Sequence, residues 1–261
     1  MCQLSDIFFR FGFENMTMEK QVNIESYLES TYLKTAAEAG ISEIETKEIV
    51  VNSINEAIDA NFACIMIRSE FIGIAKELIE TSKSKLKVGT VIDFPFGNSK
   101  TEQKIVESRL AIENGAYDID YVCDYNAFKR GAFAKFDIDI LEGTKIVLGN
   151  KKIVKWIIET GALSADEIRN IAKRISTLVQ SNFPKNANKV FIKTSTGYYG
   201  GYGATVKDVK IIKLVAGNLQ LKASGGMSNL KDCLEMIKAG ATRIGTSKAV
   251  LIYNENLENE F

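Results

Sequence analysis

The stretch Val190-Phe-Ile-Lys-Thr-Ser-Thr-Gly197 joins a short apolar run to a loop of hydroxyl residues and glycine. A run of this length, bounded by a turn signal, is typical of a buried parallel strand. Similar runs recur along the chain and alternate with longer segments that have the spacing of amphipathic helices. The expected strands are Tyr27–Leu33, Phe62–Ile67, Lys87–Phe94, Ile119–Cys123, Ile153–Glu159, Lys189–Thr194, Leu219–Ala223 and Thr242–Gly245.

This alternation predicts an α/β fold, a single (β/α)8 TIM barrel with a short N-terminal extension. An open doubly wound sheet is the main alternative, but no G-x-G-x-x-G motif follows the first strand, and eight repeats favour closure. No linker or low-complexity tract marks a domain boundary, so we expect one barrel domain over residues 17–261. Residues 1–16, where Arg10 interrupts an apolar run, form the expected extension.

The composition excludes several classes of function. The 33 basic and 33 acidic side chains give a formal net charge of zero, so nothing indicates a nucleic-acid or membrane partner. The chain has no histidine, which excludes Ser-His-Asp and Cys-His nucleophile pairs and histidine zinc sites. Proton transfer must therefore use Asp, Glu, Lys, Tyr, Cys or water. Four scattered cysteines and the lack of a long apolar run predict a cytoplasmic protein.

Two lysines at the ends of expected strands indicate covalent chemistry. Lys193 ends one apolar run, and Lys222 has the same place one strand later, although lysine is rarely buried without a reason. Strand alternation lets both side chains point into the barrel, about 5–7 Å apart. Burial and mutual repulsion both favour the neutral amine, which forms Schiff bases with carbonyl groups. A structural ion pair is the alternative, and it explains one buried lysine better than two.

Asp120 lies in the middle of another expected strand, where a carboxylate is costly to bury. It can exchange a proton near the amine or neutralise Lys222, and the two roles are compatible. Asp118, two residues earlier on the same face, is expected at the entrance of the strand.

Segments rich in glycine and hydroxyl residues follow the last three strands. Loops after strands 7 and 8 of such barrels commonly bind phosphate through backbone N–H groups. We therefore expect a phosphorylated carbonyl substrate, with the carbonyl carbon at a lysine. The predicted phosphate-binding residues of these loops are Gly197, Gly225, Gly226, Gly245 and Ser247, and the predicted pocket residues are Cys64, Thr194 and Ser224.

The run Tyr198-Tyr-Gly-Gly-Tyr-Gly203 follows the strand that carries Lys193. We expect it to form a loop that covers the substrate or lies on its phosphate side. A flexible aromatic surface loop is the alternative.

The same segments resemble the deoxyribose-phosphate aldolases, a family of class I aldolases with a (β/α)8 barrel. The resemblance extends from about Tyr27 to about Ala249 and is most specific at Phe191–Gly197 and Lys222–Gly226. Further matching motifs are Lys87–Pro95, Asn114–Asp120, Trp156–Gly161 and Arg243–Ser247.

The resemblance implies reversible cleavage of 2-deoxy-D-ribose 5-phosphate to D-glyceraldehyde 3-phosphate and acetaldehyde, without a metal or another cofactor. It implies that Lys193 is the Schiff-base lysine, that Lys222 perturbs it and that Asp120 belongs to the proton relay. It also implies a homodimer or homotetramer. Another lysine-dependent barrel aldolase, acting on a ketose phosphate, and a non-catalytic sugar-phosphate-binding barrel are the competing functions.

Three positions depart from the family pattern. Glu29 stands on the first strand where the family often has aspartate, so that acid is one methylene longer. Ser228 stands where an arginine is frequent, and Lys248 stands where a serine is common. We therefore expect Lys248 to replace the lost positive charge at the phosphate.

Overall fold

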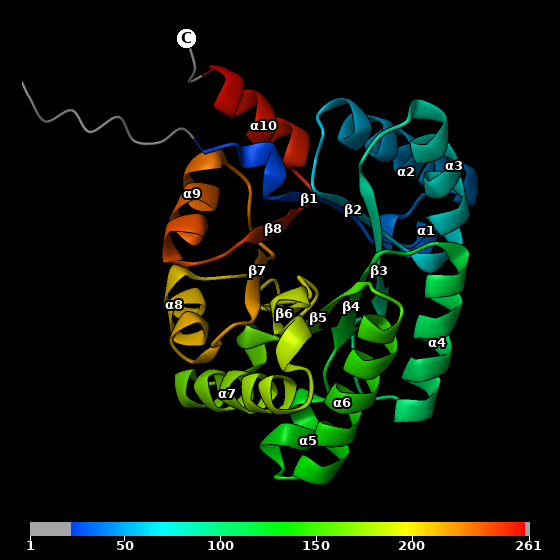
Figure 1. The fold of residues 1–261 in the computed structure, drawn as a ribbon. Helices are drawn as coiled ribbons and strands as arrows, with labels where there is room; N and C mark the ends of the chain where they lie inside the picture. The colour runs from blue at the N-terminus through cyan, green and yellow to red at the C-terminus, as the bar shows by residue number, and fades with distance from the viewer. Residues whose placement is uncertain (1–21, 259–261) are drawn as a thin grey trace, which may run out of the picture.

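The computed structural model describes residues 22–258, and its eight parallel strands close into a barrel in sequence order (Figure 1). Parallel pairing of the first and last strands closes the barrel, with Leu28 opposite Ile244 and Ser30 opposite Thr246. The predicted TIM barrel is confirmed, and the open-sheet alternative is excluded. The strands are β1 (Leu28–Tyr32), β2 (Cys64–Ile67), β3 (Lys87–Ile92), β4 (Asp118–Val122), β5 (Ile153–Ile157), β6 (Val190–Lys193), β7 (Gln220–Ser224) and β8 (Arg243–Thr246).

Helices surround the barrel and connect successive strands (Figure 1). Several begin with a capping box, as at Ser164, whose hydroxyl accepts from the backbone N–H of Glu167 while that carboxylate accepts from the N–H of Ser164. The predicted extension at residues 1–16 lies outside the described residues. The α-helices are α1 (Ala36–Ala39), α2 (Glu43–Asp59), α3 (Ile72–Ser82), α4 (Thr101–Asn114), α5 (Tyr125–Lys129), α6 (Phe133–Gly149), α7 (Ala165–Asn182), α8 (Val206–Val215), α9 (Leu230–Ala239) and α10 (Ala249–Glu258).

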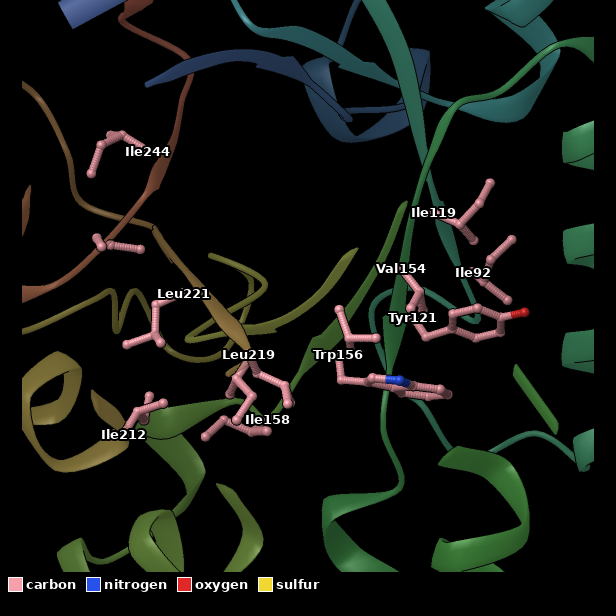
Figure 2. Packing of buried hydrophobic residues seen from close by; sticks show 14 of the residues in the cluster. Ile92, Ile119, Tyr121, Val154, Trp156, Ile158, Ile212, Leu219, Leu221 and Ile244 are labelled. Atoms are coloured by element: carbon pink, nitrogen blue, oxygen red, sulfur yellow. The ribbon is translucent and has the colours of Figure 1, made fainter. Parts of the chain in front are cut away.

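The outward faces of the strands form the main hydrophobic core with the helices (Figure 2). Tyr121 of β4 and Trp156 of β5 stack there, with ring centroids 4.7 Å apart. Gly143 of α6 lies against both rings, and a Cβ at this position would come within 2.8 Å of the indole. Because strand residues alternate between faces, Asp120 and Lys155, each one residue before an outward ring, point into the barrel.

The barrel interior divides into an apolar part and a charged part. Cys64 and Met66 of β2 form a small buried cluster with Val91 of β3 and Leu33. Buried charged side chains of β1, β4, β5, β6 and β7 also point into the interior, where Lys155 lies beside the ring of Phe191. Among residues 22–258, no helix has the length and apolar composition needed to cross a lipid bilayer.

Candidate active site

Strand register brings the candidate catalytic side chains together. Lys193 of β6 is paired with Lys222 of β7, and Asp120 of β4 is paired with Lys155 of β5. The exposed fractions of Lys193, Lys222 and Asp120 are 3%, 1% and 0%. The structure thus places all three predicted catalytic residues in one buried cluster inside the barrel.

Asp120 is the common partner of the two predicted catalytic lysines. Its Oδ2 accepts hydrogen bonds from the Nζ of Lys193 and from the Nζ of Lys222, each at 2.9 Å. Lys222 also donates to a carboxylate oxygen of Glu29, on β1. Glu29 therefore reaches the second lysine directly.

A third buried lysine belongs to the cluster and was not anticipated from the sequence. The Nζ of Lys155 lies 2.5 Å from Asp118, 3.0 Å from Asp120 and 3.2 Å from Glu29. It carries the same signal as Lys193, a lysine within a short apolar strand. Asp118, expected at the strand entrance, is a buried partner of Lys155.

The cluster separates the protonation equilibria of the two predicted catalytic lysines. Burial lowers the pKa of Lys193 to about 8, and the neighbouring cation of Lys222 adds to that shift against the opposing effect of Asp120. Burial acts on Lys222 as well, but the carboxylates of Asp120 and Glu29 raise its pKa above the ordinary lysine value. Near neutral pH, Lys193 is thus the lysine that more readily supplies a neutral amine.

Asp120 remains ionised despite its complete burial. Burial raises the pKa of a carboxyl group, but the ammonium groups of Lys155, Lys193 and Lys222 hold the pKa of Asp120 well below its usual range. The carboxylate can therefore orient both lysines as an acceptor at neutral pH.

Glu29, Cys64 and Asp118 are the described residues whose possible metal-ligating atoms lie within 4.8 Å of one another. The ammonium of Lys155 already contacts both carboxylates, and burial raises the pKa of the Cys64 thiol, so that a thiolate is disfavoured. These donors therefore suit a lysine better than a metal ion.

The predicted phosphate-side glycines lie in two loops that touch. Gly197, after β6, and Gly225 and Gly226, after β7, all have positive φ angles between 77° and 84°. A Cβ on Gly225 would come within 3.0 Å of Gly203 Cα and 3.5 Å of Gly197 Cα. Close approach of the two loops requires glycine here.

The remaining predicted phosphate-side residues occupy two environments. Gly245 lies within β8, and a Cβ there would come within 2.8 Å of Lys222 Cε, so its missing side chain makes room for that lysine. Ser247 and Lys248 are exposed in the turn before α10. At the start of α9, Asn229 and Glu255 accept the backbone N–H groups of Asp232 and Leu230, so two donors of this helix are already used.

The predicted pocket residues Thr194 and Ser224 connect β6 to β7. Thr194 Oγ1 donates to the carbonyl of Ser224 and accepts from its N–H, and Ser224 Oγ donates to the carbonyl of Ser195 at 2.6 Å. Cys64 lies in the apolar part of the interior. The contacts of Thr194 and Ser224 join the end of β6 to the end of β7, directly after Lys193.

Comparison with known proteins places the chain in a family. It is 38% identical over 232 residues to deoxyribose-phosphate aldolase 1 of Staphylococcus aureus, which covers 88% of this chain and 96% of the relative. It is 36% identical to deoxyribose-phosphate aldolase of Thermococcus gammatolerans, over 88% of this chain and 95% of that one. The chain belongs to the deoxyribose-phosphate aldolase family. No family model matches it.

The fold of this deoxyribose-phosphate aldolase family member agrees with that assignment. The solved structure of the Aeropyrum pernix enzyme matches with a TM-score of 0.74 and 26% identity, over 91% of this chain and 92% of that one. The chain is therefore an enzyme, an aldolase of the carbon–carbon lyase class. The individual roles of Lys193, Lys222 and Asp120 stay predictions.

Proposed function

We propose that this enzyme cleaves 2-deoxy-D-ribose 5-phosphate reversibly to D-glyceraldehyde 3-phosphate and acetaldehyde, through a Schiff base on Lys193. The observation that carries the proposal is the buried pair of Lys193 and Lys222, which are adjacent on β6 and β7 and share Asp120 as acceptor. Burial and the Lys222 cation lower the pKa of Lys193 to about 8. At pH 7 about one in ten molecules then has a neutral Lys193 amine, far more than an ordinary lysine allows.

The proposed reaction begins with attack of the Lys193 amine on the C1 carbonyl of the open-chain sugar. The carbinolamine loses water and becomes an iminium ion, which withdraws electrons from the adjacent carbon. Acetaldehyde has two carbons and glyceraldehyde 3-phosphate has three, so the bond that breaks joins C2 and C3. The C3 hydroxyl loses its proton, the C3 carbonyl forms, and the electron pair of the broken bond leaves an enamine on Lys193.

Asp120 and Lys222 are the proposed proton carriers of this step. The Lys222 ammonium donates a hydrogen bond to the Asp120 carboxylate, and the same carboxylate accepts from the Lys193 nitrogen. Because Asp120 is ionised and Lys222 is protonated, the Asp120 carboxylate accepts the proton of the C3 hydroxyl through a water, and the Lys222 ammonium gives a proton to C2 of the enamine. Transfer of the proton from Asp120 to Lys222 along their hydrogen bond then restores both groups. Hydrolysis of the resulting imine then releases acetaldehyde and regenerates the lysine.

Borohydride trapping tests the proposal directly. Incubation with deoxyribose 5-phosphate and borohydride should fix a reduced adduct on Lys193, identified by peptide mass, and acetaldehyde should form without borohydride. An adduct on a different lysine, or none, would overturn the assignment. A ketose-phosphate substrate that forms the adduct while deoxyribose 5-phosphate does not would favour the competing aldolase.

The substrate phosphate is proposed to lie beside Gly197, Gly225, Gly226 and the turn after β8. The segments 194–205, 225–229 and 247–248 contain a single charged residue, Lys248. Replacing it, Lys248→Ala, should raise the KM for deoxyribose 5-phosphate about three- to tenfold by removing a charge-assisted contact. The KM for unphosphorylated 2-deoxyribose is the control and should not change, whereas an unchanged KM for the phosphorylated sugar would contradict the prediction.

We also propose that the enzyme is a homo-oligomer. The relative from Aeropyrum pernix is described as a tetramer, which supports this expectation. Sedimentation equilibrium of the full chain distinguishes monomer, dimer and tetramer, and a monomer at micromolar concentration would contradict it.

A further inference from the structure

The loop after β6 is tied to the end of β5 by one buried carboxylate. Glu159 is 1% exposed, and its Oε2 accepts from the backbone N–H of Thr196 at 3.1 Å and from the Thr196 hydroxyl. The hydroxyl oxygen of Thr196 in turn accepts from the N–H of Tyr198 at 3.0 Å. The path Glu159–Thr196–Tyr198 therefore fixes the loop as far as the first tyrosine of the aromatic run.

Glu159 keeps this position at an energetic cost. Its backbone φ of 55° lies in the left-handed region, which is strained for a residue with a Cβ. Its second carboxylate oxygen, Oε1, is buried and has no hydrogen-bond partner among the described residues. Such strain persists where surrounding contacts hold it, and it is common beside active sites.

Tyr198 contacts a loop that lies three strands away in the barrel. Its ring packs edge-on against Phe94, which follows β3, with ring centroids 4.9 Å apart. The guanidinium of Arg68, which follows β2, lies 5.2 Å from the centre of the Phe94 ring and donates through Nε to the carbonyl of Leu33, after β1. We call Tyr198, Phe94 and Arg68 the roof.

Topology requires the roof to cross the mouth of the barrel. The direct contact joins Tyr198, after β6, to Phe94, after β3, and in the closed ring of eight strands β3 lies three strands from β6 one way and five the other. The two rings therefore meet over the mouth, on the side where the strands end, and Arg68 extends the contact to the loop after β2. Lys193, the last residue of β6, lies beneath this crossing.

The opposite side of Lys193 is filled. Lys155, Asp118, Cys64 and Met66 are each at most 2% exposed and occupy the interior below it. An aldehyde that reacts with an enamine on Lys193 must therefore occupy the space between that lysine and the roof.

We propose that Tyr198, positioned by Glu159 through Thr196, is the specificity-determining wall of the acceptor-aldehyde pocket and excludes bulky acceptors. This inference rests on the proposed function. In the synthetic direction, the new bond joins the methyl-derived carbon of acetaldehyde to the acceptor carbonyl carbon, and the acceptor oxygen takes up a proton. The roof limits the size of the group carried by that acceptor.

The test compares Tyr198→Ala with Tyr199→Ala. Tyr199 is the next residue and is similarly exposed, 42% against 38%, but its ring packs against Tyr125, away from Phe94. Aldol addition of acetaldehyde is measured with propanal and with benzaldehyde, which has no α hydrogen and acts only as an acceptor. We call the kcat/KM for benzaldehyde divided by that for propanal the acceptor ratio. This ratio should rise about tenfold or more in Tyr198→Ala and stay unchanged in Tyr199→Ala.

A second readout separates the pocket from the lysine. Exchange of the methyl hydrogens of acetaldehyde with D2O needs the Lys193 enamine but no acceptor. If Tyr198→Ala exchanges these hydrogens at the wild-type rate and also keeps the wild-type acceptor ratio, the proposed function is not affected, but this inference is overturned. An equal loss of exchange and of both additions would also overturn it, because Tyr198 would then act on Lys193. Absence of exchange in the wild type would overturn the proposed function, and this inference with it.

Glu159 is tested as a positioning residue by two substitutions. Glu159→Ala should raise the acceptor ratio in the same direction as Tyr198→Ala, because Thr196 loses its acceptor. Glu159→Gln should restore the wild-type ratio, since an amide oxygen still accepts both hydrogen bonds. If Glu159→Gln behaves like Glu159→Ala in both readouts, the charge of Glu159 acts on the reaction and its positioning role is overturned.

Discussion

The enzyme buries lysines in two clusters that differ in how well each ammonium is paired. Lys104 of α4 is 2% exposed, and its Nζ contacts the carbonyls of Gly97 and Val122 and the carboxylates of Asp139 and Asp93 at 2.8–3.5 Å. Lys193 is 3% exposed, yet the described residues give its Nζ one hydrogen-bond acceptor, Asp120, which it shares with Lys222.

The difference shows that burial alone does not make a lysine reactive. Acceptors that surround an ammonium compensate for the hydration that it loses on burial. An ammonium that shares its single acceptor with a second cation loses its proton more easily. Lys104 is therefore expected to stabilise the fold, and Lys193 to react. The following predictions test that distinction.

Lys193→Leu should have the largest effect on turnover. Without the amine no Schiff base forms, so cleavage of deoxyribose 5-phosphate should fall by at least about a thousandfold. The fold should persist, because Asp120 keeps Lys155 and Lys222 as partners. Turnover and circular dichroism measure the two effects, and residual turnover above about one-tenth of wild type would contradict the role of Lys193.

The pH profile should show the lowered pKa of Lys193. Because the reactive form is the neutral amine, kcat/KM should rise about tenfold per unit of pH below about pH 8 and level off above it. Stability gives an independent check, since between about pH 8 and about pH 10.4 the unfolded chain binds the proton that the folded chain has lost. Over that window the wild type should gain stability relative to Lys193→Leu; a difference that is flat with pH would contradict the shift.

Lys104→Met should have the smallest effect on turnover and a large one on stability. The substitution removes the buried ammonium that pairs with the carboxylates of Asp139 and Asp93. This loss should lower the free energy of unfolding by about 3–5 kcal/mol. Turnover per folded molecule should change less than about tenfold, because Lys104 contacts no residue of the lysine cluster.

Lys76→Met is the matched control for that substitution. Lys76 is an exposed lysine that pairs with Glu80 at 3.9 Å on the surface of α3, and its loss should change stability by less than about 1 kcal/mol. If the two substitutions lower the free energy of unfolding equally, the buried ion pairs of Lys104 contribute no more to stability than an exposed pair does.

The barrel could be predicted from the sequence because apolar strand runs alternate regularly with amphipathic segments. The predicted strands differ from the observed ones mainly at their ends; for example, Phe62 and Glu159 lie outside β2 and β5. Strand hydrogen bonding ends where the chain turns, and hydrophobicity alone does not mark that point.

The cluster could be predicted only in part. Lys193 and Lys222 were visible because each ends an apolar run before a glycine-rich loop. Lys155 has the same strand context, but it precedes outward-facing Trp156 and no such loop marks it. Lys104 lies in a helix of mixed polarity, where a lysine usually faces solvent, and its burial depends on Gly97 in the loop after β3 and Asp139 of α6, which meet only in the folded protein.

The crossing of Tyr198 to Phe94 could not be predicted from sequence spacing. More than a hundred residues separate the two rings, and their contact depends on how far the loop after β6 extends across the barrel. The aromatic run indicated a covering loop, and the structure supplies the residues that it meets.

The stack of Tyr121 on Trp156 gives the enzyme a built-in optical probe. Trp156 is the only tryptophan in the chain, its indole N–H donates to Thr144 at 3.0 Å, and it is fully buried beside a tyrosine that can transfer excitation to it. Its fluorescence should move to longer wavelength when the barrel opens to water. Because this ring follows Lys155 yet faces outward, its emission monitors the integrity of β5 without touching the chemistry on the other side of the strand.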